Sequence, residues 1–148
     1  MKGKAQLILI FVVSLFAGCA PNTVKPEDSL TEFLTAVRSK RSETTWNLLS
    51  SASRSRIDKK AKEIQTLKNS ETPIDRRTLL FDYYNLMTIR APESISVTSP
   101  ISNTAKLRVT LKNGKTTNFT MIREGSGWKV DLFQSLTQTS STHVTSTP

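Results

Sequence analysis

The sequence contains few of the residues on which catalysis and covalent stabilisation usually depend. Among 148 residues there is one cysteine, Cys19, and one histidine, His143. A lone cysteine excludes an intramolecular disulfide. His143 lies in a Ser/Thr-rich stretch where a side chain cannot be held in a fixed geometry, so a histidine-based active site is not expected. The acidic residues form no clustered ligand set, and the sequence predicts neither a metal nor a cofactor.

Long apolar runs are also absent. The longest, residues 7–17, is interrupted by a single serine, and it is much shorter than the about 20 residues that a membrane-spanning helix needs. It follows two lysines and leads into the small residues Ala17 and Gly18. A positive start, a short apolar segment and small residues are typical of a secretory signal peptide. We therefore expect residues 1–18 to be a signal peptide.

Cys19 directly follows this segment, in the stretch LFAGC at residues 15–19. The stretch resembles the lipobox of bacterial lipoproteins, although that pattern usually has leucine where this sequence has Phe16. The resemblance implies a diacylglyceryl thioether on Cys19 and, in many species, an N-acyl chain, which together give stable membrane anchoring. Ala20 follows the cysteine, and in Gram-negative lipoproteins this resembles sorting to the outer membrane, facing the periplasm. A secreted protein cut near Ala20, with a free thiol, is the alternative.

The basic residues are concentrated in one part of the chain. The net charge is +9, and removal of Lys2 and Lys4 with the signal peptide would take two from it and leave +7. Residues 38–68 hold nine basic and three acidic residues, which is +6 of that total. The candidate contacts to an anionic surface are Arg38, Lys40, Arg41, Arg54, Arg56, Lys59, Lys60 and Lys62.

Such a basic segment indicates an anionic partner. Anionic lipid, lipopolysaccharide phosphates and cell-wall polymers have the required charge, and an envelope protein is a further candidate. A nucleic-acid partner is not expected for an exported chain. The alternative is that these residues form an ordinary solvated helix face.

Periodicity predicts helices in the first half of the remaining chain. Apolar residues recur at helical spacing after Pro26, which suits the first position of a helix. A short second helix is expected after Ser42, with this residue as its cap, and a third over residues 54–67. Thr72, followed by a proline and by an aspartate three residues on, predicts the start of a fourth helix, which ends before Pro92.

From residue 94 the apolar period changes to two, which predicts an antiparallel meander with one buried face. The expected strands are residues 94–98, 105–111, 116–123 and 128–132. A three-residue loop with Gly114 in the left-handed region places Leu107 opposite Phe119 and keeps apolar residues together. The outward face is then expected to hold Lys106, Arg108, Thr120, Lys129 and Asp131. Residues 134–148 are expected to be a disordered tail.

Helices followed by a strand meander predict an α+β fold, with N-terminal helices packed on a curved antiparallel sheet. A family resemblance is carried by residues 26–37, 45–50, 53–57 and 127–132. These stretches are similar to the nuclear-transport-factor-2-like domains of small envelope lipoproteins, whose cone-shaped fold also occurs in ketosteroid isomerase and the SnoaL-like polyketide cyclases. The resemblance implies a cone-like domain over residues 26–133, behind a lipidated tether at residues 19–25. It supports the fold better than any activity.

Because this fold includes enzymes and ligand binders, three kinds of function stay open, and the plainest is a structural lipoprotein with no ligand beyond the membrane. The sequence favours a non-catalytic binding or interaction module. The alternative is a pocket for a small apolar ligand, or a degenerate enzyme in which Asp82 is an acid or base beside two tyrosines. Against that alternative, Asp82 could simply face water and the aromatic residues could fill the core. The candidate pocket residues are Trp46, Asp82, Tyr83, Tyr84, Phe119 and Trp128.

Overall fold

The structure, a computed structural model, describes residues 24–86, 90–99 and 102–139. Its strands are β1 (Pro92–Val97), β2 (Thr104–Leu111), β3 (Thr116–Glu124) and β4 (Gly127–Asp131), which form one antiparallel sheet in the order β1-β2-β3-β4. Its helices are α1 (Pro26–Arg38), α2 (Ser42–Asn47), α3 (Ser51–Leu67), the π-helix η1 (Thr78–Tyr83) and α4 (Leu132–Thr139). Helices therefore precede an antiparallel sheet, and the predicted α+β class is confirmed.

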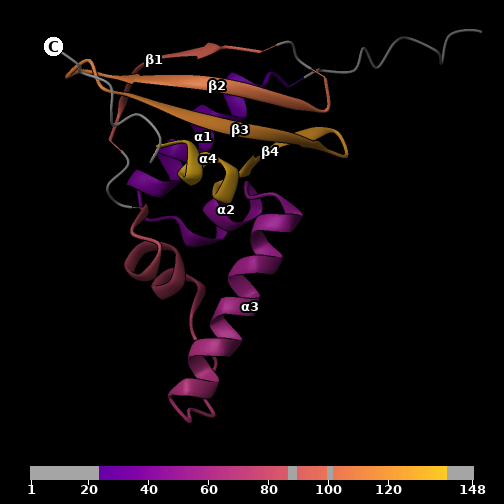
Figure 1. The fold of residues 1–148 in the computed structure, drawn as a ribbon, viewed down its shortest axis with the longest axis vertical. Coiled ribbons are helices and arrows are strands. Elements are labelled where there is room, and N and C mark those ends of the chain that lie inside the picture. Colours follow the sequence, from indigo (N-terminus) through magenta and orange to yellow (C-terminus); the bar gives the residue numbers. More distant parts are fainter. Residues whose placement is uncertain (1–23, 87–89, 100–101, 140–148) are drawn as a thin grey trace, which may run out of the picture.

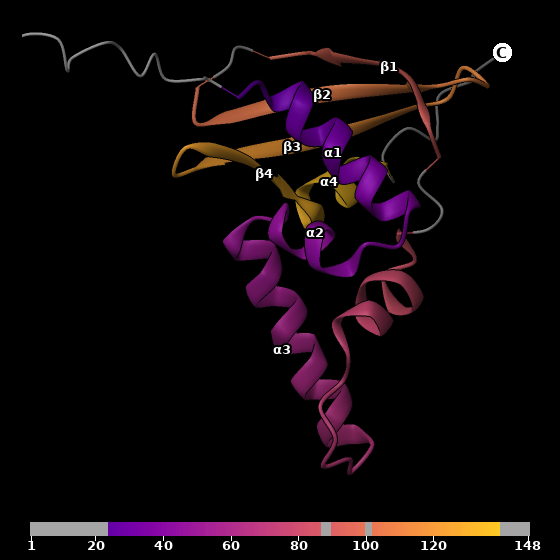
Figure 2. The same ribbon diagram turned by 180° about the vertical axis from the view of Figure 1, so that it is seen from behind.

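The helices and the sheet enclose one core. Figure 2 shows α1 lying across one face of the sheet, and in Figure 1 the molecule narrows from the sheet toward the far end of α3. Pro26 begins α1 as predicted, and the apolar stripe of this helix is buried against the inner face of the sheet. Core residues from these two layers include Leu30, Phe33, Leu34, Val37, Leu107, Phe119, Met121, Trp128 and Val130.

The predicted register of the sheet is confirmed. Leu107 pairs with Phe119, and Met121 pairs with Val130, so apolar residues share the inner face. Gly114 has a φ of 76°, the left-handed conformation that a three-residue hairpin loop needs. The alternation of apolar and polar residues and the left-handed Gly114 therefore favour the same register between β2 and β3.

Three helix starts differ from the prediction. α3 begins at Ser51, because the Ser50 side chain accepts a hydrogen bond from the Ser53 N–H (3.1 Å) and caps the helix. Ser42 is the first residue of α2, and Arg41 stands at the cap position. The helix expected from Thr72 begins only at residue 76.

The segment after residue 77 is wound as a π-helix, which the periodicity did not indicate. The Tyr84 N–H donates to the Leu79 carbonyl, five residues earlier (3.0 Å). Residues 79–81 are all buried. A π-helix turns through a smaller angle per residue than an α-helix, so three consecutive apolar side chains can face the core together.

The expected disorder from residue 134 is wrong for residues 134–139, which belong to α4. Asp131 caps this helix by accepting the Gln134 N–H (3.1 Å). Ser135 donates to the Asp131 carbonyl (2.6 Å) and accepts the Thr120 N–H (3.0 Å). These bonds bury Thr120 and Asp131, which were expected on the outward face. Residues 140–148, with His143, lie outside the described part.

Of the other three residues expected on the outward face, two are exposed and one is half-buried. Lys106 and Arg108 are exposed on β2, as predicted. Lys129 is half-buried, because its side chain reaches around the edge of the sheet and donates to the Asn47 carbonyl at the end of α2 (2.7 Å).

α3 and α4 meet at a buried hydroxyl. The Ser53 Oγ is fully buried, accepts the Leu132 N–H (3.0 Å) and lies 3.0 Å from the Ser50 Oγ, which donates to it. The first turns of the two helices are therefore joined by one short polar network inside an apolar core.

We predict that Ser53→Ala lowers the free energy of unfolding by about 1–3 kcal/mol, because the Leu132 N–H loses its partner while it stays buried. Urea denaturation measures this change. Ser55→Ala, an exposed serine two residues along the same helix, should change the value by less than about 0.5 kcal/mol. Equal effects of the two substitutions would contradict the assigned role of the Ser53 hydroxyl.

Candidate functional site

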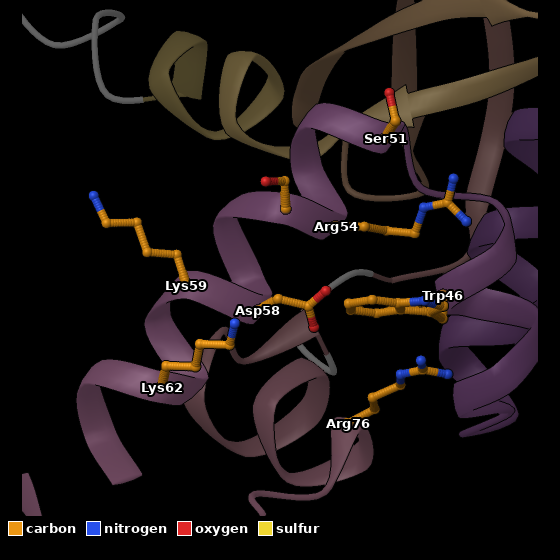
Figure 3. Close-up of a pocket in the computed structure, with 8 residues that line it drawn as sticks. Trp46, Ser51, Arg54, Asp58, Lys59, Lys62 and Arg76 are labelled. Atoms are coloured by element: carbon orange, nitrogen blue, oxygen red, sulfur yellow. The ribbon is translucent and has the colours of Figure 1, made fainter. Parts of the chain in front are cut away.

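A groove of about 590 Å³ lies between α2, α3 and Arg76, which is the first residue of the helical segment that continues into η1. We call it the basic groove. Figure 3 shows its side chains, most of which come from α3. The lining residues are Trp46, Ser51, Arg54, Ser55, Asp58, Lys59, Lys62 and Arg76. Four basic side chains and one acidic side chain give this surface a formal charge of +3.

The spacing along α3 explains why these side chains share one face. Arg54, Asp58 and Lys62 are four residues apart, and Ser51, Ser55 and Lys59 form a parallel row, so both rows face the same side of the helix. In α3, only Ser53 and Ile57 are fully buried. The helix is therefore attached to the core by a narrow stripe, and most of its surface is available for charged groups.

Arg76 closes the groove on the side opposite α3. Its guanidinium carbon lies 4.6 Å from the centroid of the Trp46 ring, and its Nη1 lies 3.4 Å from the Glu43 Oε2. Figure 3 shows Arg54 and Arg76 on opposite sides of the indole. Trp46 is only 5% exposed. The groove therefore presents guanidinium groups to a ligand, and the indole is not open for stacking.

The start of α3 is held by the β3–β4 hairpin. Glu124 accepts the Ser51 N–H (2.8 Å to Oε1 and 3.2 Å to Oε2) and the Ser51 hydroxyl (2.9 Å). A carboxylate at this position satisfies an orphan N–H and complements the positive end of the helix dipole. The helix end is thus already neutralised, and the charge that the groove offers comes from side chains.

The groove cations on α3 are not neutralised by the protein itself. All twelve acidic residues of the chain lie in the described ranges, yet no carboxylate within those ranges forms an ion pair with Arg54, Lys59 or Lys62. The ion pairs found there are Lys60–Glu63 (3.1 Å) and Arg76–Glu43 (3.4 Å). An anion entering the groove would therefore meet three basic side chains without displacing an internal partner.

The structure brings together only part of the predicted basic segment. Of the eight candidates, Arg54, Lys59 and Lys62 line the groove. Arg56 lies over the Phe133 ring (4.9 Å to its centroid), and Lys60 bonds to Glu63. The remaining three, Arg38, Lys40 and Arg41, lie at the connection between α1 and α2 and do not line the groove.

Five groove residues are not among the predicted contacts to an anionic surface, namely Trp46, Ser51, Ser55, Asp58 and Arg76. Trp46 was assigned to an apolar pocket, and Arg76 lies outside the basic segment altogether. No sequence pattern indicates that Trp46, near the end of α2, and Arg76, which follows α3, meet in the structure. Their contact is formed by the return of the chain after α3.

The six candidate pocket residues do not gather around one cavity. Phe119 and Trp128 are 4% and 3% exposed in the core, and Trp46 lines the basic groove. Asp82 is exposed. Tyr84 is half-buried, with its ring edge against Phe133. The side chain of Tyr83 lies outside the described part of the structure.

Other general features of the described residues can be stated briefly. No three His, Cys, Asp or Glu side chains there are grouped so that they could hold a metal ion. None of the helices in residues 24–86, 90–99 and 102–139 is long and apolar enough to cross a membrane. In comparisons with known proteins, the chain matched no family model and no curated protein at a significant level.

We predict that Arg76→Gln lowers the free energy of unfolding by about 1 kcal/mol, because it removes the contact with the Trp46 ring and an exposed ion pair. Arg77→Gln is the matched control, since it removes the same charge from the next residue, which is exposed. The control should stay within about 0.5 kcal/mol of the parent protein in urea denaturation. If both variants lose the same amount, the Arg76–Trp46 contact does not stabilise the fold.

Proposed function

We propose that this protein is a lipid-anchored lipoprotein of the bacterial cell envelope whose α+β domain is a non-catalytic binding module for anionic ligands. The observation that carries the proposal is the set of groove cations on α3, Arg54, Lys59 and Lys62, which have no internal ion-pair partner among the described residues. Like charges held on one face repel one another and destabilise the compact state. An anionic ligand would relieve that repulsion.

The fold we propose is the nuclear-transport-factor-2-like cone. The order of helices and strands, the single antiparallel sheet and the narrowing outline in Figure 1 are compatible with it. Because proteins of this shape have many functions, the proposed activity rests on the charged groove and not on the fold.

The proposed anchor restricts what the groove can reach. Cys19, which lies outside the described residues, would be joined to the domain by the tether that ends before Pro26, so the extended length of that tether is about 25 Å at most. α1 begins at the sheet end of the molecule, whereas α3 projects from the opposite side (Figures 1 and 2). This arrangement favours a cell-wall polymer or another envelope component as the partner over the membrane that holds the anchor.

The first test concerns the anchor. Cys19→Ser should move the protein from the membrane fraction to the soluble fraction and abolish labelling with radioactive palmitate, because serine cannot form the thioether. Ser14→Ala, in the same N-terminal segment, should leave both properties unchanged. Retention of Cys19→Ser in the membrane fraction at the level of the parent protein would contradict lipid anchoring through this residue.

The second test concerns the groove. In neutral detergent, the combined substitution of Arg54, Lys59 and Lys62 by glutamine should make the protein elute from a sulfated-dextran column at a clearly lower salt concentration. Each lost cation removes an attraction of about 1 kcal/mol to an anionic surface.

The matched control replaces three exposed basic residues away from the groove, Lys106, Arg108 and Lys115, and so changes the net charge by the same amount. This control variant should elute close to the parent protein. Equal shifts of the two triple variants would show that retention reflects net charge, and they would contradict a binding role for the groove.

A further inference from the structure

We propose that the ligand of the basic groove carries two phosphate groups joined by a hydroxyl-bearing spacer, as in a sugar or polyol bisphosphate unit, and that Asp58 recognises the spacer. This inference rests on the proposed function, because it assumes that the groove binds anions. It adds the chemical class of the ligand and assigns a selective role to the single carboxylate that lines the groove.

The order of charges along α3 sets the spacing. Arg54, Asp58 and Lys62 follow one another at intervals of four residues on one face of the helix. At a rise of about 1.5 Å per residue, the two cations are separated by about 12 Å along the axis, with the carboxylate midway between them. Two anionic groups on one ligand can therefore each meet a cation only if something neutral lies between them.

Among the described residues, no group donates a hydrogen bond to the Asp58 carboxylate, so both of its oxygens can accept hydrogen bonds from a ligand. Within the described ranges it forms neither an ion pair nor a hydrogen bond, although it lies among four basic side chains. In Figure 3 its carboxylate is directed into the groove toward Trp46. A carboxylate accepts hydrogen bonds and repels anions, so the ligand atoms that it meets must be donors. Hydroxyl groups on a spacer meet this requirement.

The other groove walls agree with this class of ligand. Ser55 adds an exposed hydroxyl next to Arg54. Lys59, the groove cation of α3 that lies between the other two along the helix, extends away from Asp58 in Figure 3. The Trp46 indole is covered by its neighbours, which disfavours recognition through ring stacking. A ligand with an anionic group at every position would place negative charge against the Asp58 carboxylate. A ligand with separated phosphates would not.

Two bisphosphates form a direct test, because both carry their phosphates on carbons 1 and 6 of a six-carbon skeleton. D-glucose 1,6-bisphosphate has hydroxyl groups on the spacer, whereas hexane-1,6-diyl bisphosphate has none. Calorimetric titration of the full-length protein in neutral detergent should show about tenfold tighter binding of the sugar compound, the size of effect expected for a hydrogen bond to a charged group.

The decisive variant is Asp58→Ala, which should bring the two dissociation constants within about twofold of each other, mainly by tightening the binding of the hexane compound. Asp58→Asn keeps an acceptor but removes the charge, so it should retain part of the preference for the sugar compound. Asp82→Ala removes one exposed carboxylate outside the groove and should leave the preference unchanged. A urea denaturation curve for each variant shows whether it is folded.

The possible outcomes separate this inference from the proposed function. If the parent protein binds both compounds equally well, and the glutamine variant of Arg54, Lys59 and Lys62 binds neither, the groove binds anions and the inference about the spacer is wrong. If the parent protein binds neither compound, and that triple variant also behaves like its control on sulfated dextran, the proposed function is wrong as well.

Phosphates separated by a hydroxyl-bearing spacer occur both in glycolipid headgroups and in polyol phosphate polymers. Competition experiments against bound glucose 1,6-bisphosphate distinguish these sources. Displacement by vesicles that contain a bisphosphorylated glycolipid would identify a headgroup, and displacement by a glycerol phosphate polymer would identify the polymer. The orientation of the groove favours the polymer, and displacement by the vesicles alone would overturn that preference.

Discussion

A short backbone bridge to the edge of the sheet determines where the basic groove forms. The Val130 N–H donates to the Leu48 carbonyl (2.8 Å), and the Ser50 N–H donates to the Val130 carbonyl (2.9 Å), which pairs this stretch with β4 as a parallel bridge. An edge strand otherwise leaves a row of backbone groups unpaired. The bridge satisfies two of them and fixes the residue immediately before α3. The direction of α3, and with it the position of every cation that the helix carries, is therefore set by backbone hydrogen bonds.

This mode of attachment explains how a helix with so little apolar surface is maintained. Ser53 and Ile57 are the fully buried residues of α3, and further along the helix Ala61 and Ile64 are only partly buried against the core. The first turn contributes the remaining contacts, through the Ser53 hydroxyl and the Glu124 carboxylate. Because the helix is held mainly at its first turns, the composition of its exposed face is constrained little by packing. A series of unpaired cations can accumulate there without disturbing the core.

The sequence was most informative where structure depends on neighbouring residues. The register of β2 and β3 follows from an alternation of period two and one glycine, Gly114, and α1 follows from its proline and its apolar stripe. The prediction failed where a distant group decides the structure. α4 exists because Asp131 and the Thr120 N–H provide partners for a polar segment, and Arg76 reaches Trp46 only through the path of the chain after α3. Neither the partners of α4 nor the contact between Arg76 and Trp46 produces a periodic pattern in the sequence.

The same distinction applies to charge. As a sequence, residues 38–68 form one segment with a net charge of +6, which indicates a broad electrostatic surface. In the structure Arg56 lies against an aromatic ring, Lys60 is paired, and the cations between α1 and α2 lie elsewhere. What remains in the groove is a few charges at defined positions around one carboxylate. Net charge is a property that many anions would satisfy, whereas alternating charges at a fixed spacing on a helix discriminate between anions. For this reason the position of Asp58, more than the number of lysines and arginines, determines which ligands the groove would accept.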